Sequence, residues 1–284
     1  MKNWIFDKTI VLTGASGGIG RELTKLFITK YHANVIGIGR NENKMLSLKE
    51  ELGENAAHFS YRLFDVSEKE NWVRFAAELT EQGTSIALLV NNAGAFPSFN
   101  RIENIPTETT ERIMRINYFS AVYAVNALSP ILVGEGKHKP AIVNVSSSAA
   151  LCTVVGTAAY SASKAALKGF TEALQMEEKG KKHVGIVYPG TTKTDLFRDD
   201  KNTENSALDL IAMPAAKMAK KIARKILRKR RRAVVGWDAK LMNLTAKFAP
   251  VKGLGIIRFV MKKSKSKVFS EVFPEEYTVN NKED

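Results

Sequence analysis

Tyr160 and Lys164 lie four residues apart, and Ser147 precedes Tyr160 by thirteen residues. Since one helical turn takes about 3.6 residues, a tyrosine and a lysine at this spacing share one face of a helix. An ammonium group beside a phenol favours the phenolate, so we expect the pKa of Tyr160 to fall below its ordinary value of about 10. The hydroxyl of Ser147, at the end of a preceding strand, could polarise a carbonyl. These three groups are what reduction of a ketone needs besides a source of hydride.

A glycine-rich turn near the start of the chain indicates where a hydride donor would bind. Residues 8–13 predict a short buried strand, and the segment from Thr13 to Gly20 then reads T-G-A-S-G-G-I-G before a helical pattern begins. Glycines let the backbone approach a pyrophosphate, and a helix N-terminus favours its negative charge. Gly14, Gly18 and Gly20 are spaced G-x-x-x-G-x-G, which differs from the commoner G-x-G-x-x-G. Taken alone, the turn is equally consistent with a corner that only joins a strand to a helix.

Six further motifs give this turn a context. In chain order, the seven motifs are T-G-A-S-G-G-I-G (13–20), D-V (65–66), N-N-A-G (91–94), R-I-N-Y (115–118), N-V-S-S (144–147), Y-S-A-S-K (160–164) and P-G-T-T-K-T (189–194). In this order and at these intervals they resemble the short-chain dehydrogenase/reductase family. The resemblance extends from about residue 8 to residue 196.

The resemblance implies a role for each of four catalytic residues. Ser147 would orient the substrate carbonyl, and Tyr160 would be the general acid in reduction and the base in oxidation. Lys164 would bind the nicotinamide ribose and lower the pKa of Tyr160. Asn117 would hold a water molecule that links Lys164 to solvent. The chain departs from the family pattern at none of these four positions.

The same resemblance implies a set of cofactor-binding residues. The glycine turn would lie under the phosphates, the residues at 65–66 and 92–94 would line the adenosine, and those at 189–194 would flank the nicotinamide. The implied residues are Gly14, Ser16, Gly18, Ile19, Gly20, Asp65, Val66, Asn92, Ala93, Gly94, Pro189, Gly190 and Thr194, together with Tyr160 and Lys164.

The end of the second predicted strand bears on the choice of cofactor. NAD-selective relatives usually carry an acidic residue there, which holds the ribose hydroxyls. In this chain Gly39 occupies the position and Arg40 follows it. A guanidinium can pair with a 2′-phosphate, so Arg40 favours NADP(H) over NAD(H). The alternative is that Arg40 only points to solvent, and Gly17 stands where many NADP-users have a second basic residue.

The alternation of apolar runs and helical patterns predicts an α/β fold. The expected strands are 8–13, 33–38, 57–64, 86–91, 140–146, 183–188 and 233–236, and the expected helices are 18–30, 42–52, 67–82, 107–133, 157–179 and 214–231. This order indicates a doubly wound Rossmann fold with a seven-stranded parallel sheet and helices on both faces. We expect a single catalytic domain over 1–237, with a substrate loop at 190–213, and a short basic and apolar helical extension over 238–284.

Composition excludes several other classes of protein. The chain of 284 residues has one cysteine, so it forms no internal disulfide, and its four histidines show no metal-ligand spacing, so we expect no metal. The first eight residues are too short and interrupted for a signal peptide, and no apolar run reaches the length of a membrane span. We expect a cytoplasmic protein, with peripheral contact at a membrane surface as a further option. The family usually forms homodimers or homotetramers through the helices predicted at 107–133 and 157–179.

Positive charge is concentrated near the C-terminus. Residues 217–267 contain 18 Lys or Arg and one acid, Asp238, a net charge of +17, whereas the whole chain carries +14. The helix at 214–231 has an ordinary core-facing stripe with a basic outer face. Beyond it, basic and apolar residues alternate irregularly from 240 to 263, as in segments that lie at an interface.

Three interpretations of this basic and apolar segment remain open. It could cover a hydrophobic substrate pocket, form a dimer contact, or lie on an anionic membrane through residues 217–267. Nucleic acid is disfavoured, because Trp237, Phe248 and Phe259 sit among aliphatic residues without forming a stacking platform.

The sequence thus predicts an NADPH-dependent reductase of a hydrophobic ketone or aldehyde, or an enzyme that oxidises the matching alcohol. The alternative is a non-catalytic dinucleotide-binding regulator or a membrane-associated scaffold. Four intact catalytic positions count against that alternative.

Overall fold

Seven short apolar runs form one parallel sheet in the computed structural model, which describes residues 3–134, 136, 138–194, 211–264 and 266–276. The strand order is β3-β2-β1-β4-β5-β6-β9, and every neighbouring pair is parallel. The strands are β1 (Thr9–Thr13), β2 (Asn34–Gly39), β3 (Phe59–Leu63), β4 (Leu88–Asn91), β5 (Ala141–Val145), β6 (His183–Pro189) and β9 (Arg232–Val235). The central strands β4 and β5 are covered on both faces and buried at every position, whereas the edge strand β3 carries polar and partly exposed residues.

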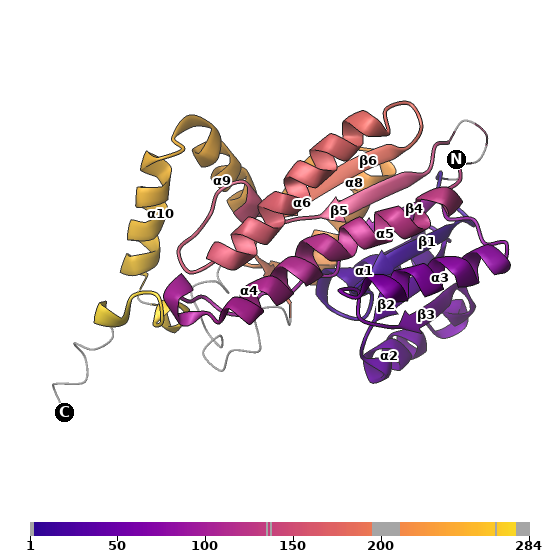
Figure 1. Ribbon diagram of the computed structural model, residues 1–284, viewed down its shortest axis with the longest axis horizontal. Helices are drawn as coiled ribbons and strands as arrows, with labels where there is room; N and C mark the ends of the chain where they lie inside the picture. Colours follow the sequence, from indigo (N-terminus) through magenta and orange to yellow (C-terminus); the bar gives the residue numbers. More distant parts are fainter. Residues whose placement is uncertain (1–2, 135, 137, 195–210, 265, 277–284) are drawn as a thin grey trace.

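Helices cover both faces of the sheet, as the doubly wound prediction required (Figure 1). Ile10 and Leu12 of β1 face α1 (Gly18–Lys25), α2 (Glu42–Leu52) and α8 (Ala215–Leu227) in one apolar cluster. Val11, between them, points to the other face and joins the cluster of α3 (Lys69–Glu81), α5 (Ser120–Leu128) and α6 (Ala158–Glu177). This alternation along one strand builds two cores from one sheet. The predicted fold class is therefore confirmed.

Strand β1 lies at the point where the chain changes direction across the sheet. It pairs with β2 on one side and with β4 on the other, so the connections wind outward from it in both directions. In open parallel sheets, ligands bind at the carboxyl ends of the strands beside such a point. The residues after β1, β4, β5 and β6 are therefore the ones that the fold gathers at one edge.

Two of the predicted helices contain a π-helical turn. The expected helix at 18–30 changes from α1 to a π turn at Leu26–Lys30. The expected helix at 107–133 divides into α4 (Thr107–Met114), a π turn at Arg115–Phe119 and α5, and then closes with a 3₁₀ turn at Ser129–Ile131 that contains a proline. A π turn accommodates one extra residue, which changes the direction of the side chains within it.

The predicted substrate loop at 190–213 is described only at its two ends. There, β7 (Thr192–Lys193) pairs in parallel with β8 (Met213–Pro214), which leads directly into α8. Residues 195–210 lie outside the described residues.

Beyond β9 the chain forms two helices at one end of the molecule, α9 (Trp237–Phe248) and α10 (Lys252–Lys263) (Figure 1). Two 3₁₀ turns follow, at Lys267–Phe269 and Pro274–Glu276. A side chain at Gly253 would overlap the methyl group of Thr245, so this glycine is what lets the two helices approach closely. None of the helices in the described residues combines the length and the apolar character that crossing a membrane requires.

Candidate active site

The four residues expected to be catalytic meet at the carboxyl edge of the sheet. The Ser147 hydroxyl, just after β5, hydrogen-bonds the phenol of Tyr160 on α6. The Nζ of Lys164 lies 5.9 Å from the centre of the Tyr160 ring. A Cβ at Gly94 would lie 3.2 Å from this Nζ and 3.3 Å from the Oδ1 of Asn117, so lysine, asparagine and the loop after β4 converge there. Residues spread over 71 positions of the sequence, from 94 to 164, thereby form one cluster.

The backbone around Ser147 fixes its hydroxyl. The backbone of Ser147 is extended, with φ −158°. Ser147 caps the 3₁₀ turn at Ser148–Ala150, because its Oγ accepts a hydrogen bond of 3.2 Å from the amide of Ala149. The neighbouring Ser146 points the other way and donates to the carbonyl of Lys164 at 3.0 Å. Ser146 therefore joins the strand end to α6, and Ser147, which the interval to Tyr160 favoured, is the serine beside the phenol.

Burial, rather than charge, determines the protonation of the Tyr160–Lys164 pair. Burial raises the pKa of Tyr160, and the hydrogen bond from Ser147 offsets this only in part. Burial also lowers the pKa of Lys164 to about 8. The sequence-based expectation of a lowered Tyr160 pKa is therefore wrong for this structure. Its physical reason is that both groups are more than nine-tenths buried, so each favours its neutral form.

Asn117 is buried and fully engaged with protein atoms. Its Oδ1 accepts from the amide of Ala95 at 2.7 Å, and its Nδ2 donates to the carbonyl of Ala95 and to the Oγ of Ser163, both at 2.9 Å. The π turn at Arg115–Phe119 carries this side chain inward. In this arrangement Asn117 ties the loop after β4 to the helix that carries Tyr160 and Lys164.

The glycine turn after β1 fits the pyrophosphate of a dinucleotide. Gly14 and Gly18 have backbone φ values of +67° and +46°, which residues other than glycine rarely adopt. A Cβ at Gly20 would overlap the carbonyl oxygen of Gly14, whereas a Cβ at Gly17 would meet nothing within 4 Å. The turn is thus tightly packed on its inner side and open on its outer side, where the N-terminus of α1 can accept an anion.

The loop after β4 is fastened to this turn. The Oγ1 of Thr13 accepts from the amides of Asn92 and Ala93, both at 2.9 Å, and the Asn92 side chain donates to the carbonyl of Thr13 at 3.0 Å. Asn92 and Ala93 therefore lie beside the glycine turn, whereas Gly94 lies next to Lys164 and Asn117. Thr13 was not among the predicted site residues, although it opens the glycine motif.

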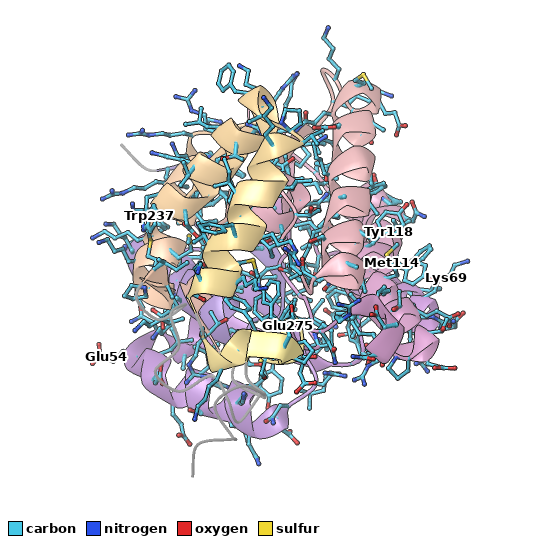
Figure 2. All side chains as sticks on the ribbon, turned by 90° about the vertical axis from the view of Figure 1, so that its left-hand side faces the viewer. Glu54, Lys69, Met114, Tyr118, Trp237 and Glu275 are labelled. Carbon is cyan, nitrogen blue, oxygen red and sulfur yellow. The ribbon has the colours of Figure 1, made fainter. Side chains whose placement is uncertain are left out.

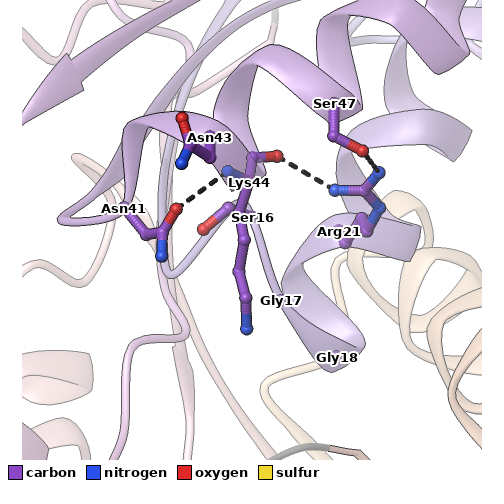
Figure 3. Close-up of a pocket in the computed structure, with 8 residues that line it drawn as sticks. All are labelled: Ser16, Gly17, Gly18, Arg21, Asn41, Asn43, Lys44 and Ser47. Atoms are coloured by element: carbon purple, nitrogen blue, oxygen red, sulfur yellow. Dashed lines mark hydrogen bonds between the residues drawn. The ribbon is translucent and has the colours of Figure 1, made fainter.

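A solvent-open cavity lies against the glycine turn and the start of α2 (Figure 3). The side chain of Asn41 caps α2 by accepting from the amide of Lys44 at 2.9 Å. The Arg21 guanidinium lines the cavity and donates hydrogen bonds to the carbonyl of Lys44 and to the Oγ of Ser47, both at 3.0 Å. The lining residues are Ser16, Gly17, Gly18, Arg21, Asn41, Asn43, Lys44 and Ser47. Of these, the sequence analysis selected only Ser16 and Gly18. Lys44 could have been found as a basic residue shortly after the second strand.

Arg40 and Asp65, predicted separately to contact the cofactor, pair with each other. The Arg40 Nη1 lies 3.2 Å from the Asp65 Oδ2. Partial burial raises the pKa of Asp65, but hydrogen bonds from Ser67 and the charge of Arg40 outweigh this and leave the pKa below its ordinary value. Val66 is buried next to this pair. A phosphate that bound Arg40 would therefore compete with a carboxylate already in place.

The segment after β6 connects the glycine turn to the C-terminal helices. A Cβ at Gly18 would lie 2.8 Å from the Cγ2 of Thr194, so these two predicted site residues are in contact. Pro189 is buried at the end of β6, and a Cβ at Gly190 would overlap the carboxylate of Asp238. That carboxylate, on the first turn of α9, accepts from the amide of Thr191 at 2.5 Å. Asp238 was missed, because only its isolation in a basic segment marks it in the sequence.

An aromatic row leads away from Tyr160. Phe96 packs edge-on against the Tyr160 ring with centroids 5.2 Å apart, Phe99 follows at 4.9 Å from Phe96, and Phe269 lies 5.1 Å from Phe99. The last of these belongs to an apolar cluster formed by the segment after α10. The sequence analysis did not select Phe96 or Phe99, although they lie only two and five residues after the N-N-A-G motif.

Comparisons with known proteins agree with this geometry. The sequence pattern of the family described as short chain dehydrogenase matches residues 8–205. The chain is 31% identical over 260 residues to the 3-ketodihydrosphingosine reductase of Bos taurus, which covers 86% of this chain and 76% of that protein. It is also 31% identical over 205 residues to the benzil reductase ((S)-benzoin forming) of Saccharomyces cerevisiae, with 69% and 76% covered.

The fold has counterparts among solved structures. A short chain dehydrogenase from Burkholderia cenocepacia, solved in complex with NADP, superposes with a TM-score of 0.73 at 23% identity. The superposition covers 89% of this chain and 98% of that chain. At this level of identity the likeness shows the fold alone.

Proposed function

The chain belongs to the short-chain dehydrogenase family of oxidoreductases, and from this premise we propose that it reduces a hydrophobic ketone or aldehyde, or oxidises the matching alcohol. The observation that carries the proposal is the convergence of Ser147, Tyr160 and Lys164 at one strand end, with the phenol hydrogen-bonded to the serine. A protein that only bound a dinucleotide would need the glycine turn but not this cluster.

The residues of the cluster divide the work of proton transfer. A nicotinamide dinucleotide bound on the glycine turn would supply the hydride. Ser147 donates a hydrogen bond to the substrate carbonyl and holds it beside the phenol. Tyr160, kept protonated by burial, gives its proton to the carbonyl oxygen. Lys164, with a pKa of about 8, can return a proton to the phenolate at neutral pH, and Asn117 keeps the loop after β4 in register with α6.

We propose NADP(H) as the preferred cofactor. Among the described residues that line the cavity beside the glycine turn, Arg21 and Lys44 are basic and none is acidic. A Cβ at Gly39 would lie 3.3 Å from the Oγ of Ser16 and overlap the Cε of Met45, so this position borders the site, and as a glycine it carries no carboxylate. Arg40 lies on the neighbouring loop. Positively charged groups suit a 2′-phosphate, which would take the place of Glu51 beside Arg21 and of Asp65 beside Arg40. The structurally similar Burkholderia protein was solved with NADP.

The proposed substrate is a hydrophobic carbonyl compound. Phe96 and Phe99 present an aromatic surface beside Tyr160. The names of two relatives, 3-ketodihydrosphingosine reductase and benzil reductase, each describe a reductase, and we infer an apolar ketone for this chain as well.

The proposed assembly is a homodimer or homotetramer through the helices α4–α6. Exposed Phe119 and Met176 on these helices support an apolar contact there. A cytoplasmic location remains a prediction, as does peripheral contact with an anionic membrane through residues 217–267. We do not propose nucleic acid as a partner.

The test is consumption of NADPH and of NADH across small polar, long-chain aliphatic, diaryl and steroid ketones, with the matching alcohols assayed in reverse. We expect turnover on a bulky apolar ketone, faster with NADPH. Tight binding of NADPH without turnover on any ketone or alcohol would favour the regulator or scaffold instead. Turnover confined to small polar ketones would remove the hydrophobic substrate from the proposal.

A further inference from the structure

The two C-terminal helices expose an unusual amount of apolar surface. Of the sixteen large hydrophobic residues that are exposed in the described part of the chain, nine lie between Trp237 and Val260. They are Trp237, Leu241, Leu244, Phe248, Val251, Leu254, Ile256, Phe259 and Val260. Single exposed apolar residues are common, but a contiguous group of this size marks an interaction surface.

On α9 the exposed apolar residues form one face. Trp237, Leu241, Leu244 and Phe248 follow one another at intervals of four, three and four residues, which places them on one side of a helix. Ala239, on the opposite side, is buried, and its neighbour Asp238 fixes the first turn to the segment after β6. The helix is therefore attached by its inner side, and its apolar side faces outward.

The second helix extends this surface. Gly253 brings α10 close to α9, and Ile257 and Met261 continue the inward-facing side one and two turns further on. Phe259 and Val260 are 61% and 59% exposed on the outward side. Figure 2 shows α10 at the front of this end of the molecule, with Trp237 at the start of α9 and Glu275 on the turn after α10.

The charges on this hairpin, residues 237–263, are all of one sign at its surface. It contains six Lys or Arg and one acid, the buried Asp238. The Nζ of Lys247 lies 5.3 Å from the centre of the Phe248 ring, and that of Lys263 lies 6.0 Å from the Phe259 ring. Long basic side chains beside exposed aromatic rings can keep their charge in water while the rings enter an apolar phase.

We propose that the hairpin 237–263 docks the protein on the surface of an anionic membrane, with its apolar face among the acyl chains and its basic residues at the headgroups. Amphipathic helices with this combination lie in the plane of the interface and prefer anionic lipid. A second copy of the chain fits less well, because a twofold contact would place six cations against six others. A cover for the chain's own pocket also fits less well, because Phe248 and Val251 are 74% and 80% exposed.

The hairpin is also linked to the candidate active site. After α10, Val268, Phe269, Val272 and Phe273 pack with Phe99 and Val155, and Phe99 contacts the ring that packs on Tyr160. Docking would therefore hold the loop beside Tyr160 close to the lipid. This consequence, which rests on the proposed function, identifies a membrane-dissolved carbonyl compound as the substrate.

The test is sedimentation of the full chain with vesicles of phosphatidylcholine alone and of phosphatidylcholine mixed with phosphatidylserine. We expect binding to the mixed vesicles that salt weakens. The triple variant Leu241→Ser/Phe248→Ser/Val251→Ser and the double variant Lys240→Glu/Lys247→Glu should each weaken it by about tenfold or more. The matched control is Val73→Ser/Val133→Ser, which removes exposed apolar side chains from α3 and from the loop before β5 and should bind like the wild type.

Two further measurements distinguish membrane docking from the two alternatives, a contact with a second copy of the chain and a cover for the chain's own pocket. Light scattering without vesicles measures the mass of the protein in solution. The proposal is overturned if the wild type is an oligomer that binds no vesicles and the triple variant is a monomer. Reduction of a water-soluble ketone overturns it if the triple variant loses turnover while vesicle binding is unchanged, because the hairpin would then be a pocket cover. Sedimentation needs neither cofactor nor turnover, so its failure is distinguishable from failure of the proposed function.

Discussion

A lysine beside an aromatic ring occurs both at the candidate active site and on the C-terminal hairpin, in opposite environments. The Nζ of Lys164 lies 5.9 Å from the centre of the Tyr160 ring, and that of Lys247 lies 5.3 Å from the Phe248 ring. The tyrosine is 7% exposed and Phe248 is 74% exposed. We propose that the first pair serves proton transfer and the second membrane adhesion, because the two pairs differ in burial and only Tyr160 carries an acidic hydroxyl.

The largest expected effect comes from removing the phenol hydroxyl at the buried pair. Tyr160→Phe should lower the turnover number by about a thousandfold, since general acid catalysis contributes about 10²- to 10⁴-fold. NADPH binding, measured by fluorescence titration, should stay within about twofold, because the ring is retained. The matched change on the hairpin, Phe248→Leu, should leave turnover of a water-soluble ketone unaltered. If Tyr160→Phe turned over as fast as the wild type, the Tyr160 hydroxyl would not be the general acid, and the two pairs would not differ in function.

The next effect concerns the basic residues around the cavity. Lys44→Ala and Arg40→Ala should each raise the KM for NADPH by about tenfold, because each removes a charged partner of the 2′-phosphate. The KM for NADH should not change. Lys49→Ala, on the exposed side of the same helix α2, is the control. An equal rise of both KM values would mean that these side chains only support the fold.

Burial of Lys164 should also be measurable as a cost in stability. Its folded pKa of about 8 lies below the ordinary 10.5, so between these pH values the unfolded chain binds more protons and stability rises with pH. Below pH 8 the folded protein carries the full cost of a buried charge. Lys164→Met should therefore be more stable than the wild type at pH 7, by about 2 kcal/mol.

Urea unfolding without cofactor at several pH values checks this. The difference should shrink as the pH approaches 10.5, and Lys247→Met should show no difference of this kind. A Lys164→Met protein that is less stable than the wild type at pH 7 would contradict the role given to burial.

The smallest expected effect concerns the close packing of α9 and α10 in the C-terminal hairpin. Gly253→Val should lower the free energy of unfolding by about 1 kcal/mol and speed proteolysis between α9 and α10, because the new side chain overlaps Thr245. Gly255→Ala, at a position with nothing within 4 Å, should be neutral or slightly stabilising. Turnover of a soluble ketone should survive both changes. Equal protease sensitivity in the two variants would argue against close packing of the helices.

The sequence predicted the sheet well, because each strand is a local apolar run that needs no knowledge of its neighbours. β5 is buried at all five positions, and α8 buries the stripe that its spacing indicated. The helix at 107–133 was less predictable. Its π turn depends on how Asn117 reaches Ala95 and Ser163, and that is a tertiary contact.

The site residues were predicted better than their environment. Ser147, Tyr160 and Lys164 meet as expected, but the direction of the Tyr160 pKa was wrong, since a sequence shows the neighbouring charge and not the depth of burial. Asp238 and Phe96 could not be selected, because their partners lie 47 and 64 residues away along the chain.

The C-terminal hairpin is tied to the rest of the molecule at its start and again beyond its end, while the outward side of its two helices is exposed. Asp238 fastens its start to the segment after β6, and Phe269 and Val272 fasten the chain again beyond its end. Insertions or deletions within the hairpin would therefore leave both anchors in place. Among relatives, we expect the length and composition of this segment to have diverged quickly while its anchors stayed constant, so that one catalytic body could be adapted to different cellular surfaces.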